Sequence, residues 1–300
     1  MLSILIPTYN YNVYNLVLEL HIQCLESGII FEIIVIDDGS NTRILENEKI
    51  NTLSYSSYEK LKSNIGRSKI RNLLAQKGNY QWLLFLDADV FPKNKNFISA
   101  YIQCINNEEK TVNGGLLYPE NKPEKNKLFR WIYGKRREAL PFEKRKKNPY
   151  LSFLTLNFLI NKSVFEKVSF NETIPNLRHE DTLFSYNLMR KNITIEHIDN
   201  PVYHYGMDDF EIAIRKENES LTALKYLIDN KLISKDYVRI SKLFSTITKL
   251  KLISLLVLFH KLTKYLFLKN LAGKYPMLYV FDLYRLGYIA KLEKESRGLL

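Results

Sequence analysis

The chain has 300 residues, of which 46% are hydrophobic and 25% charged, a composition that excludes a disordered or fibrous protein. Its formal net charge is +12, and its two cysteines exclude a disulfide framework and a thiolate zinc site, so we expect a reducing compartment. The first residues have no basic start, and no stretch reaches the roughly 18 apolar residues of a spanning helix, so we expect neither a secretory signal nor a span.

The positive charge is concentrated in two segments of the chain. Residues 122–147 hold 11 Lys or Arg and 3 acidic residues, a net charge of +8, and residues 241–300 hold the same numbers. The other 214 residues therefore have a net charge of −4. This distribution argues against a uniformly basic nucleic-acid-binding protein and favours two local contacts with anionic partners.

The first 120 residues alternate short apolar runs with helical patterns, which is typical of βαβ units that build a mostly parallel sheet. We expect strands at residues 3–6, 32–36, 51–56 and 82–86. We expect helices at residues 14–25, 68–76 and 97–105.

The remainder of the chain is less regular at first and then helical from about residue 209. We expect strands at residues 111–118, 153–160 and 193–197, and a helix at residues 181–190. The basic segment 122–147 has no clean period, which predicts a loop with a short helix. The pattern therefore indicates two domains, an α/β domain at residues 1–207 and a helical region at residues 208–300.

Three polar motifs stand where predicted strands end. They are Pro-Thr-Tyr-Asn at residues 7–10, Asp-Asp-Gly-Ser at residues 37–40 and Asp-Ala-Asp at residues 87–89. A single acidic turn after a strand is usually a solvated turn or a helix cap. However, ligands of open α/β sheets bind beyond the carboxyl ends of the strands, so several such motifs indicate a binding site.

The residue types in these motifs suit a nucleotide-sugar. Two carboxylates one residue apart, Asp87 and Asp89, can hold a hard divalent cation whose other positions go to diphosphate oxygens and water. Such an ion would neutralise a leaving diphosphate. The chain has neither the Gly-x-Gly-x-x-Gly motif nor a P-loop, so a Rossmann dehydrogenase and a P-loop NTPase are both poor fits.

Four motifs in chain order closely resemble those of the family 2 glycosyltransferases of GT-A fold. They are Ile-Pro-Thr-Tyr-Asn at 6–10, Ile-Asp-Asp-Gly-Ser at 36–40, Asn-Ile-Gly-Arg-Ser at 64–68 followed by Arg71 and Asn72, and Leu-Asp-Ala-Asp at 86–89. The acidic pair Glu180-Asp181 and His204, in Pro-Val-Tyr-His-Tyr-Gly at 201–206, extend the resemblance to about residue 206. The resemblance implies an α/β GT-A fold with a mostly parallel sheet flanked by helices.

The resemblance also implies an activity: inverting transfer from a nucleotide-sugar, commonly a UDP-sugar, with Mn²⁺ or Mg²⁺ as the metal. The general base would be Asp181, and the metal would bind Asp89, Asp87 and His204. The residues implied to contact the nucleotide are Pro7, Thr8, Tyr9, Asp38, Asn64, Gly66, Arg71, Asp87 and Ala88. Glu180 and Asn157 would meet the acceptor.

Several of these roles have a structural alternative. Acidic residues such as Glu180 and Asp181 favour helix N-termini, although an inverting reaction needs a carboxylate base, with Glu180 second to Asp181. His204 could be a structural histidine, and Asn157 could be a strand residue bonded to the backbone. Arg71 could hold the loop at residues 87–89 or form a surface ion pair of little energetic weight.

Residues 250–271 combine many apolar side chains with a lysine every few positions. The lysines argue against a span but suit a helix at a membrane surface, with apolar side chains in the headgroup boundary and lysines on anionic phosphates. The alternative is a helical subdomain packed on the catalytic domain, or a homodimer. We favour the membrane, and therefore expect a cytoplasmic protein that is peripheral on the cytoplasmic face.

The element Gln-x-x-Arg-Trp of processive relatives is absent, because both tryptophans, Trp82 and Trp131, precede Asp181. We therefore expect transfer of a single hexose or N-acetylhexosamine to a saccharide or lipid-linked saccharide of the surface polysaccharide or lipopolysaccharide type. Two alternatives stay open: a non-catalytic, basic protein that binds membranes or polyanions, and a nucleotidyltransferase on a related sheet.

Overall fold

The computed structural model describes residues 1–175 and 178–297, which form two compact units. The first unit holds residues 1–119, 138–175 and 180–206, and the second holds residues 120–137, 178–179 and 207–297. Residues 120–137, which the sequence places inside the first domain, thus pack within the second unit. These units are defined by the packing of the chain. The predicted division into domains 1–207 and 208–300 stays a prediction.

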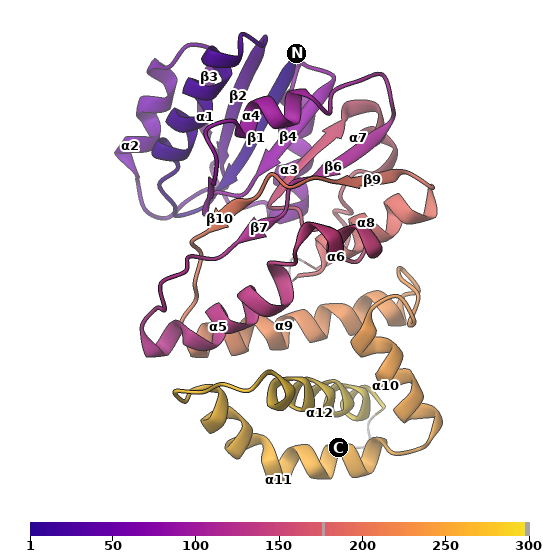
Figure 1. Ribbon diagram of the computed structural model, residues 1–300. Coiled ribbons are helices and arrows are strands. Elements are labelled where there is room, and N and C mark those ends of the chain that lie inside the picture. Colours follow the sequence, from indigo (N-terminus) through magenta and orange to yellow (C-terminus); the bar gives the residue numbers. More distant parts are fainter. Residues whose placement is uncertain (176–177, 298–300) are drawn as a thin grey trace. The chain divides into compact units, whose positions relative to one another are not determined.

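A seven-stranded sheet organises the first unit (Figure 1), and its strands lie in the order β3-β2-β1-β4-β8-β6-β9. Their bounds are β1 Leu2–Thr8, β2 Phe31–Asp37, β3 Ser56–Lys60, β4 Trp82–Leu86, β6 Lys110–Asn113, β8 Asn157–Asn161 and β9 Thr194–His197. β1 pairs in parallel with β2 and β4, and β8 is antiparallel to both β4 and β6. The expected mostly parallel α/β sheet is confirmed.

Helices cover both faces of this sheet. Leu5 of β1 packs in an apolar core with Ile70 and Leu74 of helix α3, while its neighbours Ile4 and Ile6, which point to the opposite face, are equally buried. Burial on both faces explains why β4 is a continuous apolar run and why β1 and β2 are mostly apolar. The helices of this unit are α1 Tyr14–Ser27, α2 Leu45–Glu48, α3 Arg67–Lys77, α4 Phe97–Ile102, α6 Phe142–Lys147, α7 Lys162–Val168 and α8 Glu180–Arg190, with the 3-10 helix η1 Lys49–Thr52.

A small second sheet, in the order β5-β10-β7, lies beside the main one. Its strands are β5 Val90–Pro92, β7 Leu116–Leu117 and β10 Val202–His204. β10 is antiparallel to β5, and His204 is the partner of Val90 in this ladder. Because Asp89 directly precedes Val90, this pairing carries His204 to the Asp-Ala-Asp motif.

The second unit is helical, as expected for the C-terminal extension. Its helices are α5 Leu128–Tyr133, α9 Phe210–Asp229, α10 Arg239–Lys249, α11 Ile253–Leu271 and α12 Leu278–Ser296. Phe129 of α5, Ile214 of α9, Leu271 of α11 and Phe281 of α12 meet in its apolar core. Among the described helices, none is by itself long and apolar enough to cross a membrane; α10 and α11 reach that threshold only as a pair, bent by 118° at their junction.

Three predicted strands are wrong in extent. Residues 51–56 were expected to be a strand, but residues 49–52 form η1 and β3 begins at Ser56. The reason is Asn51, whose side chain exchanges hydrogen bonds with the backbone of Tyr58 in β3 and so lies beside that strand. The strand predicted at residues 153–160 begins only at Asn157.

The strand predicted at residues 111–118 divides between two sheets. β6 ends at Asn113 in the main sheet, and β7 begins at Leu116 in the small one. Gly115 turns the chain with a φ of +82°, and a Cβ on Gly114 would lie 2.4 Å from the carbonyl oxygen of Asn200. A side chain fits neither the conformation nor the space, so two glycines are needed where the chain changes sheets.

The basic segment 122–147 is more helical than expected. It contains the 3-10 helix η2 Lys125–Lys127, α5, the π-helical turn η3 Gly134–Glu138 and α6. One of its cations is structural, because the buried guanidinium of Arg145 donates to the carbonyl oxygens of Asn113, Gly114 and Ile198.

Candidate active site

The motifs at residues 7–10 and 37–40 meet at one edge of the main sheet, because β1 and β2 are adjacent and parallel. Thr8 pairs with Asp37, and the backbone N–H of Asp38 donates to the carbonyl oxygen of Thr8 at 2.8 Å. β4 runs parallel to β1 on its other side, so the motif at residues 87–89 leaves the sheet in the same direction. The convergence expected from the sequence is therefore observed.

Asp37 holds the turn that follows β2. One of its carboxylate oxygens accepts the backbone N–H of Ser40 at 2.7 Å, and the other accepts the Tyr58 hydroxyl at 2.8 Å. The Ser40 hydroxyl oxygen in turn accepts the backbone N–H of Asn10 at 2.6 Å, which ties this turn to the loop after β1. Asp37 therefore orients the loop that follows β2.

Asp38 draws the loop before α3 onto the strand ends. Its carboxylate accepts the backbone N–H groups of Ile65 at 2.7 Å and of Gly66 at 3.1 Å. Gly66 has a φ of +91°, which places its N–H toward Asp38 at the start of the helix. Burial raises the pKa of Asp38, and these two donors offset only part of that effect. Each carboxylate oxygen keeps a lone pair for a base or ribose donor.

The first motif presents its backbone and one exposed ring. The Thr8 side chain is buried and donates its hydroxyl to the carbonyl oxygen of Tyr11 at 3.1 Å. Tyr9 is exposed, and its hydroxyl oxygen accepts the Asn41 amide at 3.1 Å. Pro7 lies inside β1, two residues beyond the last pair with β4, where its missing N–H leaves no ladder bond unmade. A nucleotide contact at Thr8 would therefore use the backbone.

Arg71 joins two parts of the site that lie far apart in the sequence. Its buried guanidinium donates to Asp87 at 2.8 Å and to Glu180 at 3.4 Å, and it stacks 5.5 Å from the centre of the Phe170 ring. Burial alone would lower the pKa of Arg71, but the charges of Asp87 and Glu180 outweigh it and raise the pKa. Arg71 thus fixes the nucleotide-side motif against the first turn of α8.

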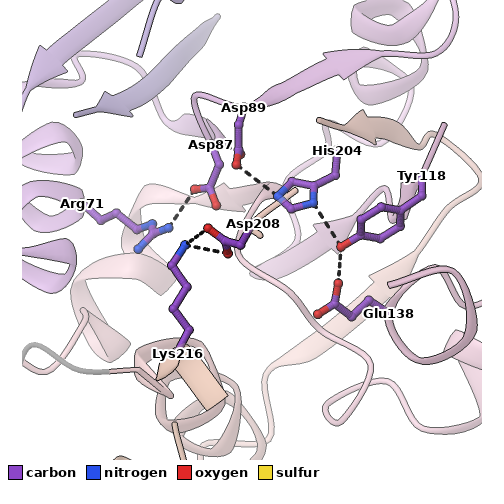
Figure 2. A network of polar contacts seen from close by, with 8 residues as sticks. All are labelled: Arg71, Asp87, Asp89, Tyr118, Glu138, His204, Asp208 and Lys216. Atoms are coloured by element: carbon purple, nitrogen blue, oxygen red, sulfur yellow. Dashed lines mark hydrogen bonds and ion pairs between the residues drawn. The ribbon is translucent and has the colours of Figure 1, made fainter. Parts of the chain in front are cut away.

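Asp89 and His204 face each other across the small sheet (Figure 2). The Asp89 Oδ2 and His204 Nε2 atoms are 3.2 Å apart, and the backbone N–H of Tyr205 donates to the Asp89 carbonyl oxygen at 2.8 Å. His204 Nδ1 lies 3.1 Å from the Tyr118 hydroxyl oxygen, and that hydroxyl donates to Glu138. Four side chains from different parts of the first unit therefore form one polar chain.

The directions of the Tyr118 hydrogen bonds determine which ring nitrogen of His204 is available to a metal ion. Tyr118 has one hydroxyl proton and donates it to Glu138, so His204 Nδ1 must be the donor to Tyr118. In the neutral imidazole, Nε2 then presents a lone pair to the Asp89 carboxylate, an arrangement that a shared cation stabilises. A carboxylate oxygen and an imidazole nitrogen are both common ligand atoms for divalent ions, and these two lie 3.2 Å apart. Asp89 and His204 therefore fit a divalent ion.

Gly206 leaves the space that this pair needs. A Cβ at this position would lie 1.8 Å from Asp89 Oδ2 and 3.1 Å from His204 Nε2. Within residues 1–175 and 178–297, no three acidic, His or Cys side chains converge as a ready-made metal site. The structure thus brings together Asp89 and His204 and turns Asp87 toward Arg71.

Asp181 lies in the first turn of α8, next to Glu180. Its carboxylate accepts the backbone N–H of Thr182 at 2.6 Å. Burial, followed by the negative charge of Glu180, raises the pKa of Asp181 to about 6, although the Thr182 N–H and Arg71 favour the ionised form. A carboxylate with a pKa near 6 is ionised at pH 7 and still basic enough to take a proton from a hydroxyl in the transition state.

Asn157 does not join this group. Its amide oxygen accepts the Tyr101 hydroxyl at 2.7 Å, and its amide nitrogen donates to the carbonyl oxygens of Gly115 and Asn200 at 2.9 and 3.0 Å. Every polar atom of this buried side chain already has a protein partner, which corresponds to the backbone-bonded alternative. The fold thus holds the Asn157 side chain in place, and a contact between Asn157 and the acceptor stays a prediction.

Sequence reasoning missed four residues of the site. Tyr118 and Glu138 orient His204, Gly206 leaves room beside Asp89, and Tyr11 lies near enough to Asp89 for that charge to add to the effect of burial in raising the tyrosine pKa. Gly206 belongs to a motif that the sequence had singled out. The other three carry no signal, since their partners are distant in the chain.

Comparisons with known proteins identify the family of the chain and its fold. The family model described as Glycosyl transferase family 2 matches residues 3–169. No curated protein matches the chain. Among solved structures, mannosyltransferase PcManGT from Pyrobaculum calidifontis, in complex with GDP-Man and Mn²⁺, is 12% identical with a TM-score of 0.55, covering 99% of this chain and 87% of that one.

Two further structures share the fold. Mannosyl-3-phosphoglycerate synthase from Rubrobacter xylanophilus is 13% identical with a TM-score of 0.55, covering 78% of this chain and 76% of that one. S. aureus TarS 1-349, in complex with UDP-GlcNAc, is 16% identical with a TM-score of 0.51, covering 99% and 92%. The chain spans 43% of the length of a longer S. aureus TarS chain.

Proposed function

Because the chain belongs to glycosyl transferase family 2, we propose that it transfers a single sugar from a nucleotide-sugar to a saccharide hydroxyl with inversion at the anomeric carbon. The observation that carries this proposal is the Arg71 bridge between Asp87 and Glu180. It holds a nucleotide-side carboxylate beside the helix turn that bears Asp181. In this proposal, the donor site and the proton acceptor for the acceptor hydroxyl are linked through Arg71.

The proposed reaction assigns each side chain one step. The Asp181 carboxylate takes the proton of the acceptor hydroxyl as its oxygen attacks the anomeric carbon, and the bond between that carbon and the diphosphate breaks. The electron pair of this bond leaves with the nucleoside diphosphate. Asp38 and the loop at residues 64–66 contact the nucleotide, while Glu180 orients Arg71 and an acceptor hydroxyl.

A divalent cation fits this chemistry. Asp89 and His204 would hold Mn²⁺ or Mg²⁺, with Asp87 on the nucleotide side. When bound, such an ion would neutralise charge on the leaving diphosphate. Tyr118 and Glu138 would support this site through hydrogen bonds that fix the tautomer and the ring orientation of His204.

We propose a UDP-sugar as the donor and a saccharide or lipid-linked saccharide of surface polysaccharide or lipopolysaccharide type as the acceptor, on the cytoplasmic face of the membrane. Support comes from the TarS complex with UDP-GlcNAc, although the PcManGT complex with GDP-Man keeps a guanine nucleotide as the second candidate.

The test is a thermal-shift panel of UDP, GDP and their sugars with and without Mn²⁺, followed by release of nucleoside diphosphate from the donor that stabilises the protein most. We expect Asp89→Ala to lose the Mn²⁺-dependent shift and the release. Asp236→Asn, which alters an exposed carboxylate of the second unit, is the control and should keep both. Stabilisation by no nucleotide of the panel would contradict the proposal.

A further inference from the structure

One face of helix α11 is apolar, and no other described part of the second unit covers it. Six apolar side chains on it are between 39% and 74% exposed. They are Leu255, Leu258, Phe259, Leu262, Tyr265 and Leu266, and we call them the α11 apolar face. Spacings of three and four residues place all six on one side of the helix. Soluble proteins rarely expose so many large apolar side chains side by side.

The opposite side of α11 is the one that packs. His260 and Leu271 are buried there, and the His260 ring lies 5.4 Å from the ring of Tyr284 in α12. The helix is therefore held in the fold through one side. The α11 apolar face is free to meet a partner that no other described part of its unit supplies.

The positive charge around the α11 apolar face favours an anionic partner. Residues 238–281 contain eight Lys or Arg and no acidic residue. A second copy of the chain seated on the same face would bring two such cationic surfaces together, and like charges across an interface oppose association. An anionic lipid surface offers apolar depth for the leucines and phosphates for the lysines.

A cavity of about 750 Å³ in the same unit also combines apolar and cationic side chains. Its apolar wall comes from α5, including Trp131, and from residues 275–279 at the start of α12. The described residues that line it include four cationic side chains and no acidic one. The four are Lys122, Lys135, Arg136 and Lys274. We call it the cationic cavity; its lining suits an apolar group that carries a phosphate.

We propose that the second unit docks on an anionic phospholipid bilayer. The α11 apolar face enters the boundary between headgroups and acyl chains, and the cationic cavity holds the phosphate of one lipid. Tyr275 and Tyr279, which are exposed beside the cavity, suit the same interfacial depth. This docking is independent of the proposed chemistry, since no residue of the candidate active site takes part in it.

The test of the apolar face uses the full chain and sedimentation with vesicles of phosphatidylcholine, with or without phosphatidylglycerol. Replacing Leu262 and Leu266 by Asn should lower the partition coefficient on anionic vesicles at least about tenfold. Ile30→Asn with Leu45→Asn, a pair of similar exposure in the first unit, is the matched control and should bind as the wild type does. All four positions are exposed, so the variants are expected to fold, and an unchanged melting temperature verifies it.

The test of the charge removes two cavity lysines. Lys122→Gln with Lys274→Gln should weaken binding to anionic vesicles at least about fivefold and reduce its salt dependence. Lys95→Gln with Lys191→Gln removes the same net charge from the first unit and should change binding less. Equal binding to neutral and anionic vesicles would overturn the proposal, as would unchanged binding by either second-unit variant.

A second copy of the chain makes a different prediction. If light scattering shows a dimer that Leu262→Asn with Leu266→Asn dissociates, and the wild type does not bind vesicles, the α11 apolar face is a protein interface and the proposal is wrong. Nucleotide-sugar hydrolysis in solution should be the same in all four variants, so a failure of membrane docking and a failure of the proposed transferase activity are distinguishable.

Discussion

Replacing Asp181 by Asn tests the base assignment and its electrostatic setting together. The change keeps the shape of the side chain and leaves an amide oxygen to accept the Thr182 N–H, which lies 2.6 Å from the carboxylate in the wild type. What it removes is a negative charge that stands next to Glu180. We expect Asp181→Asn to lower the activity and to raise the stability, because the negative charge that makes Asp181 a base also destabilises the folded chain.

The stability effect can be estimated from the pKa. Asp181 has a pKa of about 6 in the folded chain against an ordinary value of 3.8. Each pH unit corresponds to about 1.4 kcal/mol, so the ionised carboxylate costs the folded state at most about 3 kcal/mol at pH 7. Asp181 is only half-buried and solvent screens part of this cost, so we expect Asp181→Asn to raise the free energy of unfolding by about 1–2 kcal/mol.

The pH dependence has a definite sign. The folded-state pKa of Asp181 is raised, so folding favours the protonated form, and wild-type stability falls as the pH rises from about 4 to about 6. Urea unfolding of wild type and Asp181→Asn should therefore give similar stabilities near pH 4 and diverge up to about pH 6. Wild-type kcat/KM should rise with pH to a plateau near pH 7, with its midpoint near the folded-state pKa of about 6, because the base acts in its ionised form.

Activity supplies the second measurement. Loss of a general base should lower kcat by about 10² to 10⁴-fold, measured as release of nucleoside diphosphate with acceptor present. Full turnover by Asp181→Asn would show that another group is the base, and Glu180→Gln would be examined next. A variant that is less stable than the wild type at pH 7 would refute the electrostatic reasoning, whatever its activity.

The remaining predictions concern three contacts. Arg71→Met should lower the free energy of unfolding by about 3–5 kcal/mol in urea titration, because Asp87 and Glu180 lose their shared cation, and Arg71→Lys should recover only part of it. Gly206→Ala should displace the Asp89 carboxylate, which a Cβ would meet at 1.8 Å, and weaken Mn²⁺ binding at least about tenfold by titration calorimetry, with less than about 1 kcal/mol change in stability. His260→Leu should stabilise the second unit by about 1–2 kcal/mol in thermal unfolding, because both ring nitrogens of this buried histidine lack a hydrogen-bond partner and burial lowers its pKa to about 4. Equal stability of the Arg71 variants and wild type, an unaltered Mn²⁺ affinity, or a less stable His260→Leu would each contradict the contact concerned.

The sheet and its edge were predictable from local pattern. Apolar runs that end in Asp-Asp-Gly-Ser or Asp-Ala-Asp indicate buried parallel strands followed by polar loops, and parallel strands bring their carboxyl ends together. That argument places Asp38 and Asp87 at one edge without any knowledge of distances. It fails at Gly114 and Gly115, where one apolar run serves two sheets, because the direction that a strand takes after a glycine depends on what it packs against.

Arg71 shows what sequence spacing leaves open. Its position one helical turn beyond Arg67 suited a nucleotide contact as well as an ion pair, and only the fold brings Glu180, 109 residues away, to within 3.4 Å of it. The same holds for Asn157, whose neighbours in sequence are apolar and whose three polar partners come from α4, from the turn after β6 and from the turn before β10.

By itself the sequence determined the α/β fold, the order of the acidic motifs and the two basic segments, since periodicity, strand-end chemistry and charge are local properties. The tertiary structure decided which carboxylates share a cation, that His204 meets Asp89 with Tyr118 and Glu138 behind it, and that one face of α11 stays exposed. Those features depend on contacts between residues many positions apart, and such contacts form only when the chain has packed.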